Sequence, residues 1–209
     1  GTLDNKITLL NEEQTNDVIS KLKDDEYKIT NIVKKERNKA SRPPFITSTL
    51  QQDAGAKFNY NAKRVMRIAQ KLYEGVEVGK EMVGLITYMR TDSTRLSDVF
   101  VESATEYIKE KYGQNYVGKV KVSKKKENVQ DAHEGIRPTS AMRTPESVKE
   151  YLSADEFKLY SLIYARALAS LMAPARFDAT SVVLENNNYF FINIIRKYAI
   201  IYLSIYRTK

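Results

Sequence analysis

The chain has 209 residues and an apolar fraction of 42%, which is enough to bury a core and excludes a disordered chain. Its 34 Lys and Arg against 26 Asp and Glu give a formal net charge of +8, which favours a nucleic-acid partner. The lack of Cys excludes disulfides and thiolate metal sites, while the short apolar runs and the absence of a signal-peptide pattern predict a cytoplasmic protein without a membrane partner.

Residues 1–46 alternate between strand and helix patterns. They predict a strand at residues 7–10, a helix at residues 11–23 with Glu12 and Glu13 in its first turn, and a strand at residues 27–35. A Lys-Ala-Ser-Arg-Pro-Pro segment at residues 39–44 then predicts a linker.

Helical periodicity dominates between residues 47 and 174. It predicts helices at residues 47–58, 62–74, 98–112, 144–152 and 154–172, and a short apolar run predicts a strand at residues 83–89. Strand patterns return at residues 180–184 and 189–194. The sequence therefore predicts an α+β fold, with a mainly helical domain of residues 47–174 inserted in a β-rich domain made of residues 1–46 and 175–209.

The helix predicted at residues 62–74 has one apolar and one basic face. A break at residues 59–61 separates it from the preceding helix, and two helices followed by a strand form a winged-helix-like pattern. Its positive charges could follow a DNA backbone, although a charged helix face is often only a solvated one. A second basic patch follows at residues 119–126. The apolar face of the helix comprises Val65, Ile68, Ala69 and Leu72, and the basic face comprises Lys63, Arg67 and Lys71, with Gln70 at its border.

The segment GLITYMRTDSTRLS at residues 84–97 places Tyr88 two residues before Arg90. A free phenol is a weak nucleophile at neutral pH, so a neighbouring cation that binds the phosphate under attack would activate it. Arg90 has planar donors suited to phosphate oxygens, and Thr91 adds a polar group beside it. Because the chain has 14 Tyr, a packing role for Tyr88 is the alternative.

His133 is the single histidine of the chain. It lies between two carboxylates, Asp131 and Glu134, which would favour its cationic form, and a cationic imidazole suits a phosphate. A structural hydrogen-bonding role is the alternative, and a metal site is not expected because no Cys or second His is near.

Three strings of the sequence resemble the signatures of the type IA DNA topoisomerases, the bacterial topoisomerase I family. They are PFITSTLQQ at residues 44–52, the Tyr88 segment at residues 84–97, and DAHEGIRPT at residues 131–139, in the order that the family has. A weaker match is MAPA at residues 172–175, followed by Phe177 and Asp178.

The resemblance implies that Tyr88 attacks one DNA strand and stays joined to its 5′ phosphate, before strand passage and religation. It implies that Arg90 holds the scissile phosphate and that His133 binds a nearby backbone phosphate. It also implies a helical domain that carries the tyrosine and is mounted on a β-rich arch, in a cytoplasmic, nucleoid-associated enzyme. Beyond the catalytic pair Tyr88 and Arg90, the candidate DNA-binding residues are His133, Arg137, Gln70, Thr91, Lys63, Arg67 and Lys71.

The family also needs Mg²⁺, held by an acidic Asp-x-Asp-x-Glu motif and a separate Glu, which this sequence lacks. The chain is therefore expected to be a central fragment without a cofactor of its own, which binds single-stranded DNA and does not relax supercoiled DNA without the remaining domains of the parent enzyme. After about residue 190 the sequence departs from the family's glycine-containing pattern, and this β-branched, aromatic end is expected to self-associate.

Two other functions fit some of these residues. A non-catalytic winged-helix module that binds duplex DNA would need only the basic helix, with Tyr88 as a packing residue. A tyrosine recombinase also combines Tyr, Arg and His, but such enzymes place the tyrosine after the Arg and His motifs, whereas Tyr88 precedes His133.

Overall fold

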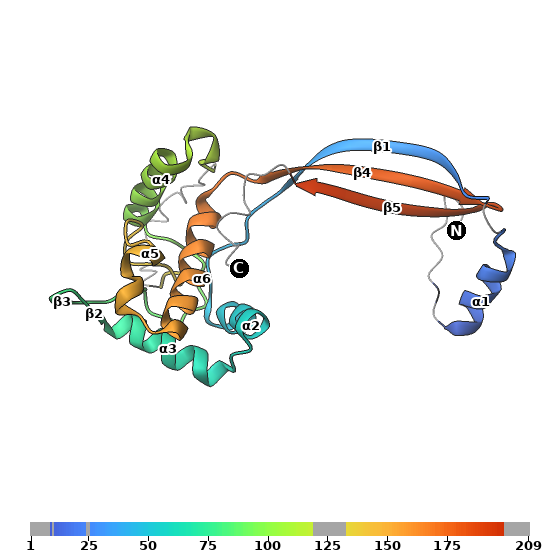
Figure 1. Ribbon diagram of the computed structural model, residues 1–209. Coiled ribbons are helices and arrows are strands. Elements are labelled where there is room, and N and C mark those ends of the chain that lie inside the picture. Colours follow the sequence, from blue (N-terminus) through green and yellow to red (C-terminus); the bar gives the residue numbers. More distant parts are fainter. Residues whose placement is uncertain (1–8, 10, 24–25, 119–132, 199–209) are drawn as a thin grey trace, which may run out of the picture. The chain divides into compact units, whose positions relative to one another are not determined.

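The computed structural model describes residues 9, 11–23, 26–118 and 133–198 (Figure 1). The chain divides into two compact units, which meet in sequence between Lys39 and Ala40 and between Pro174 and Ala175. The first unit contains α1, β1, β4 and β5, and the second contains helices α2 to α6 with the short strands β2 and β3. The fold is α+β, as the sequence predicts.

In its described residues, the first unit is a three-stranded antiparallel sheet with one helix. Its strands lie in the order β1-β4-β5, and β4 and β5 are joined by Asn187 and Asn188, which both have positive φ and form a tight hairpin turn. The predicted helix and strands are confirmed, and the strands are longer than predicted; the strand predicted at residues 7–10 lies, except for Leu9, outside the described residues. The elements are α1 at Glu12–Lys21, β1 at Lys28–Lys39, β4 at Ala175–Asn186 and β5 at Tyr189–Tyr198.

The second unit packs its helices around α6, whose sides are apolar over most of its length. Four predicted helices form with nearly the predicted bounds, whereas the pattern at residues 144–152 is divided between α5 and a 3-10 turn, Lys149–Tyr151. The buried face of α3 is the predicted one. The helices are α2 at Thr47–Phe58, α3 at Ala62–Glu74, α4 at Asp98–Tyr112, α5 at Pro145–Val148 and α6 at Ala154–Leu171.

The break between α2 and α3 is made by two asparagines. Asn59 adopts a left-handed backbone conformation at φ 57°, which Asn tolerates better than most residues, and ends α2. Asn61 then caps α3, because its side-chain oxygen accepts a hydrogen bond from the backbone N–H of Arg64 at 2.8 Å.

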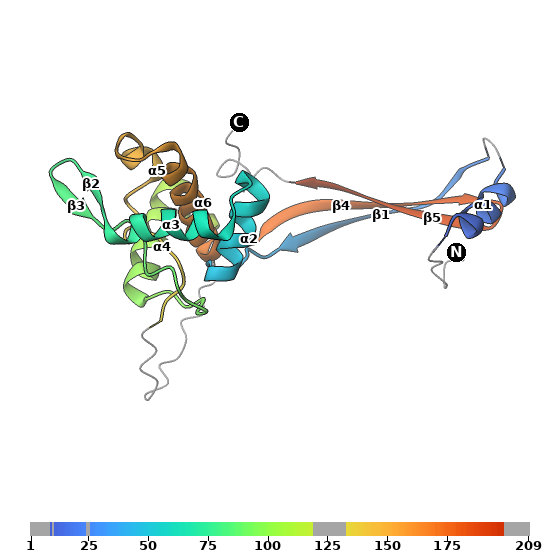
Figure 2. The ribbon, with the colours of Figure 1, turned by 90° about the horizontal axis from the view of Figure 1, so that it is seen from below.

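The strand predicted at residues 83–89 is wrong. The chain instead forms a short hairpin, β2 at Val76–Val78 and β3 at Glu81–Val83, which projects beyond the end of α3 (Figure 2), and residues 84–97 are irregular. The backbone N–H of Leu85 donates to the carbonyl of Leu72 at 2.7 Å, and Leu85 in turn accepts from the N–H of Thr139 at 2.9 Å. Backbone groups of the Tyr88 segment are therefore paired with a helix end and a distant loop instead of a strand ladder.

In the described part of the chain, no helix combines the length and the apolar character that crossing a membrane requires.

Candidate nucleic-acid interface

The first and second sequence motifs are joined by the first residue of α2. The hydroxyl of Thr47 donates to the carbonyl of Met89 at 2.8 Å and accepts from the backbone N–H of Thr91 at 2.9 Å. The backbone N–H of Thr47 donates to the carbonyl of Thr91 at 3.0 Å. These bonds hold the backbone on both sides of Arg90, so the Cα that carries the Arg90 side chain is kept in place.

The third motif is joined to the second in the same way. The N–H of Thr87 donates to the carbonyl of Arg137 at 2.9 Å, and the Thr87 hydroxyl donates to the carbonyl of Gly135 at 2.8 Å. The N–H of Ile136 donates to the carbonyl of Phe45 at 2.8 Å, which joins the third motif to the first. Three motifs far apart in sequence therefore form one hydrogen-bonded layer.

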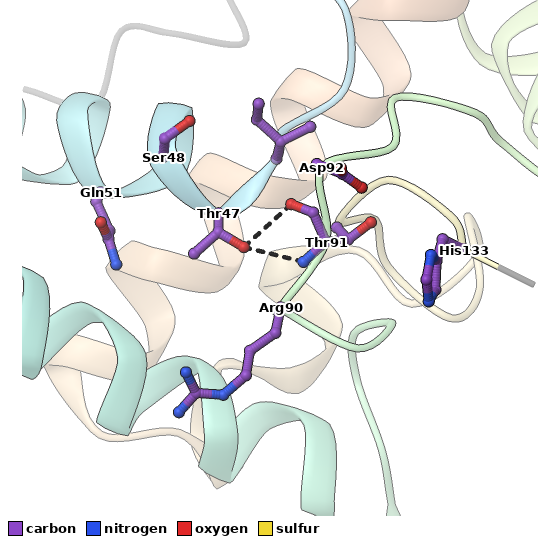
Figure 3. Close-up of a pocket in the computed structure, with 8 residues that line it drawn as sticks. Thr47, Ser48, Gln51, Arg90, Thr91, Asp92 and His133 are labelled. Atoms are coloured by element: carbon purple, nitrogen blue, oxygen red, sulfur yellow. Dashed lines mark hydrogen bonds between the residues drawn. The ribbon is translucent and has the colours of Figure 1, made fainter.

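A pocket of about 470 Å³ opens on this layer (Figure 3). The view shows Arg90 and His133 extending in different directions on either side of Thr91. Both of these side chains are exposed, so their positive or hydrogen-bonding groups are accessible to a ligand. The pocket is lined by Ile46, Thr47, Ser48, Gln51, Arg90, Thr91, Asp92 and His133.

The structure brings together three of the predicted site residues in this pocket, namely Arg90, Thr91 and His133. Four further lining residues were not among the predicted site residues, although they lie within the quoted motifs, namely Thr47, Ser48, Gln51 and Asp92. Asp92 is close to Arg90 in sequence, whereas Thr47, Ser48 and Gln51 are brought to it by the hydrogen bonds between the first two motifs, which the spacing along one motif does not reveal.

Tyr88 is 47% exposed; it precedes Arg90 by two residues but does not line the pocket. Its neighbour Met89 is fully buried, which anchors the chain between Tyr88 and Arg90. The Tyr88 ring packs edge-on against the ring of Tyr73 in α3, with ring centroids 5.2 Å apart and an interplanar angle of 63°. Tyr73 was not predicted as a site residue, because the β2–β3 hairpin separates it from Tyr88 in sequence.

Arg137 has protein partners for its guanidinium. Its Nε donates to the Glu134 carboxylate at 2.7 Å, its Nη2 donates to the Ser97 hydroxyl at 3.1 Å, and its Nη1 donates to the Pro138 carbonyl at 3.0 Å. The side chain is 12% exposed and stacks over Phe100 at 4.6 Å. This placement favours a positioning role for Arg137 over direct contact with DNA.

The same ion pair alters the surroundings expected for His133. Of the two neighbouring carboxylates, Glu134 is engaged by Arg137, while Asp131 lies outside the described residues, as does the basic patch at residues 119–126.

The basic face of α3 divides into accessible and engaged residues. Lys63 and Arg67 are exposed, and no ion pair joins them to the part of the chain that the structure describes. Lys71 instead forms an ion pair of 2.5 Å with Glu156 of α6, whose side chain is only 7% exposed. Gln70 donates to Glu74 at 2.6 Å on the same helix.

A polar cluster fixes the start of α3 against α6. The carboxylate of Asp155 accepts from the Tyr60 hydroxyl at 2.6 Å and from Arg64 Nη2 at 2.6 Å. These hydrogen bonds lower the pKa of Asp155, and burial together with the bond to Asp155 raises the pKa of Tyr60 to about 12. Tyr60 is thus a hydrogen-bond donor at neutral pH, and α3 is held in one orientation.

Among the described residues, no group of three or more His, Cys, Asp or Glu side chains is arranged to hold a metal ion.

Two comparisons with known proteins agree with each other. Residues 2–208 match the bacterial-type family model described as DNA topoisomerase. The chain is also similar to full-length topoisomerase I from Thermotoga maritima, with 37% sequence identity and a TM-score of 0.77 over 98% of this chain and 33% of that one. The chain thus spans about a third of the length of that relative. On the motifs, the fold and both comparisons, this chain belongs to the type IA DNA topoisomerases.

Proposed function

We propose that this chain binds single-stranded DNA at the Arg90–His133 pocket and supplies the nucleophile, Tyr88, of a topoisomerase that is complete only with further domains. The observation that carries the proposal is the convergence of all three motifs on one layer, with the side chains of Arg90 and His133 at a pocket and an exposed phenol two residues before Arg90.

Arg90 and His133 would each bind a backbone phosphate of the strand. A guanidinium forms charge-assisted hydrogen bonds to phosphate oxygens, and the first turn of α2, which lines the same pocket, adds the positive end of a helix dipole. Thr91, which lines the same pocket, would donate a hydrogen bond from its hydroxyl to the strand. We propose that Arg137 supports these contacts by holding the third motif.

In the proposed chemical step, the phenol oxygen of Tyr88 bonds to phosphorus in a backbone phosphodiester. The bond between that phosphorus and the 3′ oxygen of the preceding nucleotide breaks, so a 5′-phosphotyrosine link and a free 3′ hydroxyl result. The phenol gives up one proton and the 3′ oxygen gains one, so the exchange is balanced. Religation is the reverse step, and strand passage takes place between the two.

Type IA topoisomerases use Mg²⁺, but the described residues contain no cluster that fits a metal ion. We propose that the ligands of such a metal come from domains beyond this chain. We propose that relaxation of supercoiled DNA depends on those domains, and that this chain does not perform it by itself.

We propose that the two compact units correspond to an arch, residues 1–46 and 175–209, and a tyrosine-bearing domain, residues 47–174. The division between Pro174 and Ala175 supports the second boundary, whereas the first division falls between Lys39 and Ala40 and groups residues 40–46 with the tyrosine-bearing unit. In the tyrosine-bearing domain, α2 and α3 followed by the β2–β3 hairpin have the order of a helix-turn-helix with a wing.

That order also favours a second candidate function, a duplex-binding module in which α3 and the hairpin contact DNA and Tyr88 only packs. The two functions differ in the DNA that they prefer. A topoisomerase gate reads the backbone of one strand, whereas a winged helix reads a groove of the duplex.

The test is fluorescence anisotropy of labelled single-stranded and duplex oligonucleotides over a salt series. We expect single strands to bind more tightly, and Arg90→Ala and His133→Ala each to weaken that binding about tenfold, since each removes a hydrogen-bonding contact to a backbone phosphate. Lys109→Ala on α4 is the matched control for loss of one exposed charge. If the chain prefers duplex DNA and neither substitution weakens binding, the proposed single-strand site is wrong and the winged-helix module is favoured.

The role of Tyr88 is tested separately. When the remaining domains of the parent enzyme are added with Mg²⁺, the wild-type chain should form a covalent adduct with single-stranded DNA. Tyr88→Phe should bind DNA as tightly but form no adduct, because only the hydroxyl is lost. An adduct that persists in Tyr88→Phe contradicts the assignment.

A further inference from the structure

The Tyr88 ring has an aromatic partner on a different element. Tyr73, in the last turn of α3, packs edge-on against it at 5.2 Å between centroids. The two side chains are 41% and 47% exposed, so a large part of each ring faces solvent. A half-exposed tyrosine is free to change rotamer unless a neighbour restrains its ring.

The backbone holds the two tyrosines together at close range. Leu85 donates its N–H to the carbonyl of Leu72, which ties the Tyr88 segment to the end of α3. Gly84 packs against the carbonyl of Tyr73, where a Cβ on residue 84 would lie only 2.8 Å from that oxygen. The carbonyl of Gly84 also accepts from the Thr139 hydroxyl at 2.8 Å. The close approach of Gly84 to the carbonyl of Tyr73 therefore requires glycine at position 84. The hydrogen bonds to Leu72 and from Thr139 keep the segment before Tyr88 against the end of α3.

We propose that Tyr73 is a positioning residue for Tyr88, which holds the phenol ring in the orientation from which its oxygen attacks the phosphate. This inference rests on the proposed function of Tyr88. Edge-to-face packing restrains the ring without touching the hydroxyl, so the oxygen stays accessible to a DNA strand. Since reacting atoms must be aligned within a few tenths of an ångström, loss of such a restraint slows the chemical step without weakening DNA binding.

Three variants at position 73 distinguish ring packing from effects of the hydroxyl and of side-chain bulk. Tyr73→Phe keeps the ring and removes the hydroxyl, Tyr73→Leu keeps apolar bulk without the aromatic edge, and Tyr73→Ala removes both. Tyr27→Ala, at a tyrosine that is 50% exposed in the first unit, is the matched control for loss of an exposed ring.

The first readout uses this chain alone, labelled with 3-fluorotyrosine. The ¹⁹F signal of Tyr88 is assigned by its absence in Tyr88→Phe. We expect it to shift and narrow toward that of a freely rotating tyrosine in Tyr73→Ala and Tyr73→Leu, and to change little in Tyr73→Phe and Tyr27→Ala. An unchanged Tyr88 signal in Tyr73→Ala would show that Tyr73 does not restrain the ring, and this result would overturn the proposal.

The second readout separates binding from chemistry, with the remaining domains and Mg²⁺ supplied. We expect Tyr73→Ala to lower the single-turnover rate of adduct formation at saturating DNA by about tenfold or more, with the Kd for single-stranded DNA within about twofold of wild type. Tyr73→Phe should keep the wild-type rate. A loss in Kd as large as the loss in rate would make Tyr73 a DNA contact and overturn the positioning role.

Failure of this inference is distinguishable from failure of the proposed function. If Tyr88 is not the nucleophile, Tyr88→Phe still forms the adduct, whatever the Tyr73 variants do. If Tyr88 is the nucleophile but is positioned by other contacts, Tyr88→Phe is inactive and Tyr73→Ala reacts at the wild-type rate.

Discussion

The hydroxyl of Thr47 lies 2.8 Å from the carbonyl oxygen of Met89 and 2.9 Å from the backbone nitrogen of Thr91. One side chain at the start of α2 therefore binds the backbone immediately before and immediately after Arg90. The same residue begins the helix that lines the pocket, so the position of Arg90 and the position of α2 depend on each other.

Thr47→Val should remove these bonds while it keeps the shape of the side chain. Because the N–H of Thr91 loses its acceptor, we expect the free energy of unfolding to fall by about 1–3 kcal/mol and the affinity for single-stranded DNA to fall several-fold. Urea unfolding and anisotropy measure the two effects. Thr47→Ser should behave as wild type, and Thr94→Val at an exposed threonine is the control.

The salt dependence of DNA binding should show which residues on the basic face of α3 contact phosphates. If Lys63 and Arg67 contact phosphates, Lys63→Ala and Arg67→Ala should each reduce the slope of log K against log salt by about 0.7–1, because one fewer counterion is released. Lys71→Ala should change the slope less, since Lys71 is held by Glu156. Its main effect should be a loss of stability of about 1–3 kcal/mol, because the buried carboxylate of Glu156 loses its cationic partner and is left with the hydrogen bond from the Ser153 N–H. Equal slope changes for all three variants would mean that Lys71 leaves Glu156 to bind DNA.

Stability should fall in acid because of Asp155 and Glu156. Hydrogen bonds from Tyr60 and Arg64 lower the pKa of Asp155; burial opposes ionisation of Glu156, but hydrogen bonds from Lys71 and Ser153 outweigh it and lower the pKa of that carboxyl. A lowered folded-state pKa means that the unfolded chain binds more protons, so the stabilisation is present above the usual values of 3.8 and 4.5 and is lost as pH falls below them.

Thermal unfolding between pH 6 and pH 3 tests this pH dependence. We expect the Tm of the wild type to drop steeply at the acid end, and the Tm of an Asp155→Asn, Glu156→Gln double variant to start lower and to change less with pH. Parallel curves for the two proteins would contradict the assignment to this carboxylate pair.

Substitution of Arg137 should lower the free energy of unfolding more than it lowers the affinity for DNA. Arg137→Lys keeps the charge but not the planar fork that reaches Glu134, Ser97 and Pro138, so we expect a loss of about 2 kcal/mol in the free energy of unfolding. Arg137→Ala should lose at least as much. Unchanged stability with weakened DNA binding would identify Arg137 as a direct DNA contact instead.

β5, one of the two edge strands of the sheet in the first unit, should promote self-association. β5 lies at the edge of the three-stranded sheet and carries three exposed isoleucines, Ile192, Ile194 and Ile195. Edge strands with apolar side chains pair with further strands, so sedimentation velocity should show association that rises with concentration. Ile194→Lys should reduce it, whereas Ile19→Lys on α1 should not. A monomer at all concentrations would contradict this prediction.

The local sequence pattern was sufficient to predict most helices, but it did not predict the conformation of the Tyr88 segment. The apolar spacing of α3 and the capping asparagine at position 61 defined that helix within its own residues. Around Tyr88, buried Leu85, Ile86 and Met89 resemble a strand, but a short apolar run cannot distinguish a strand from a buried irregular segment. Here its hydrogen-bond partners are Thr47, Leu72 and Thr139, which no local pattern identifies.

By itself, the sequence determined the α+β class, the positions of most helices, and three motifs that indicate a type IA topoisomerase, because these depend on patterns within short stretches of the chain. Only the tertiary structure decided which charges are available to a ligand. Arg137 and Lys71 have carboxylate partners, while Arg90 and His133 reach a pocket. It also placed Tyr73 beside Tyr88. These relationships arise from packing and hydrogen bonds between segments far apart in the chain, and the free energy of such contacts is set by burial and geometry that exist only after folding.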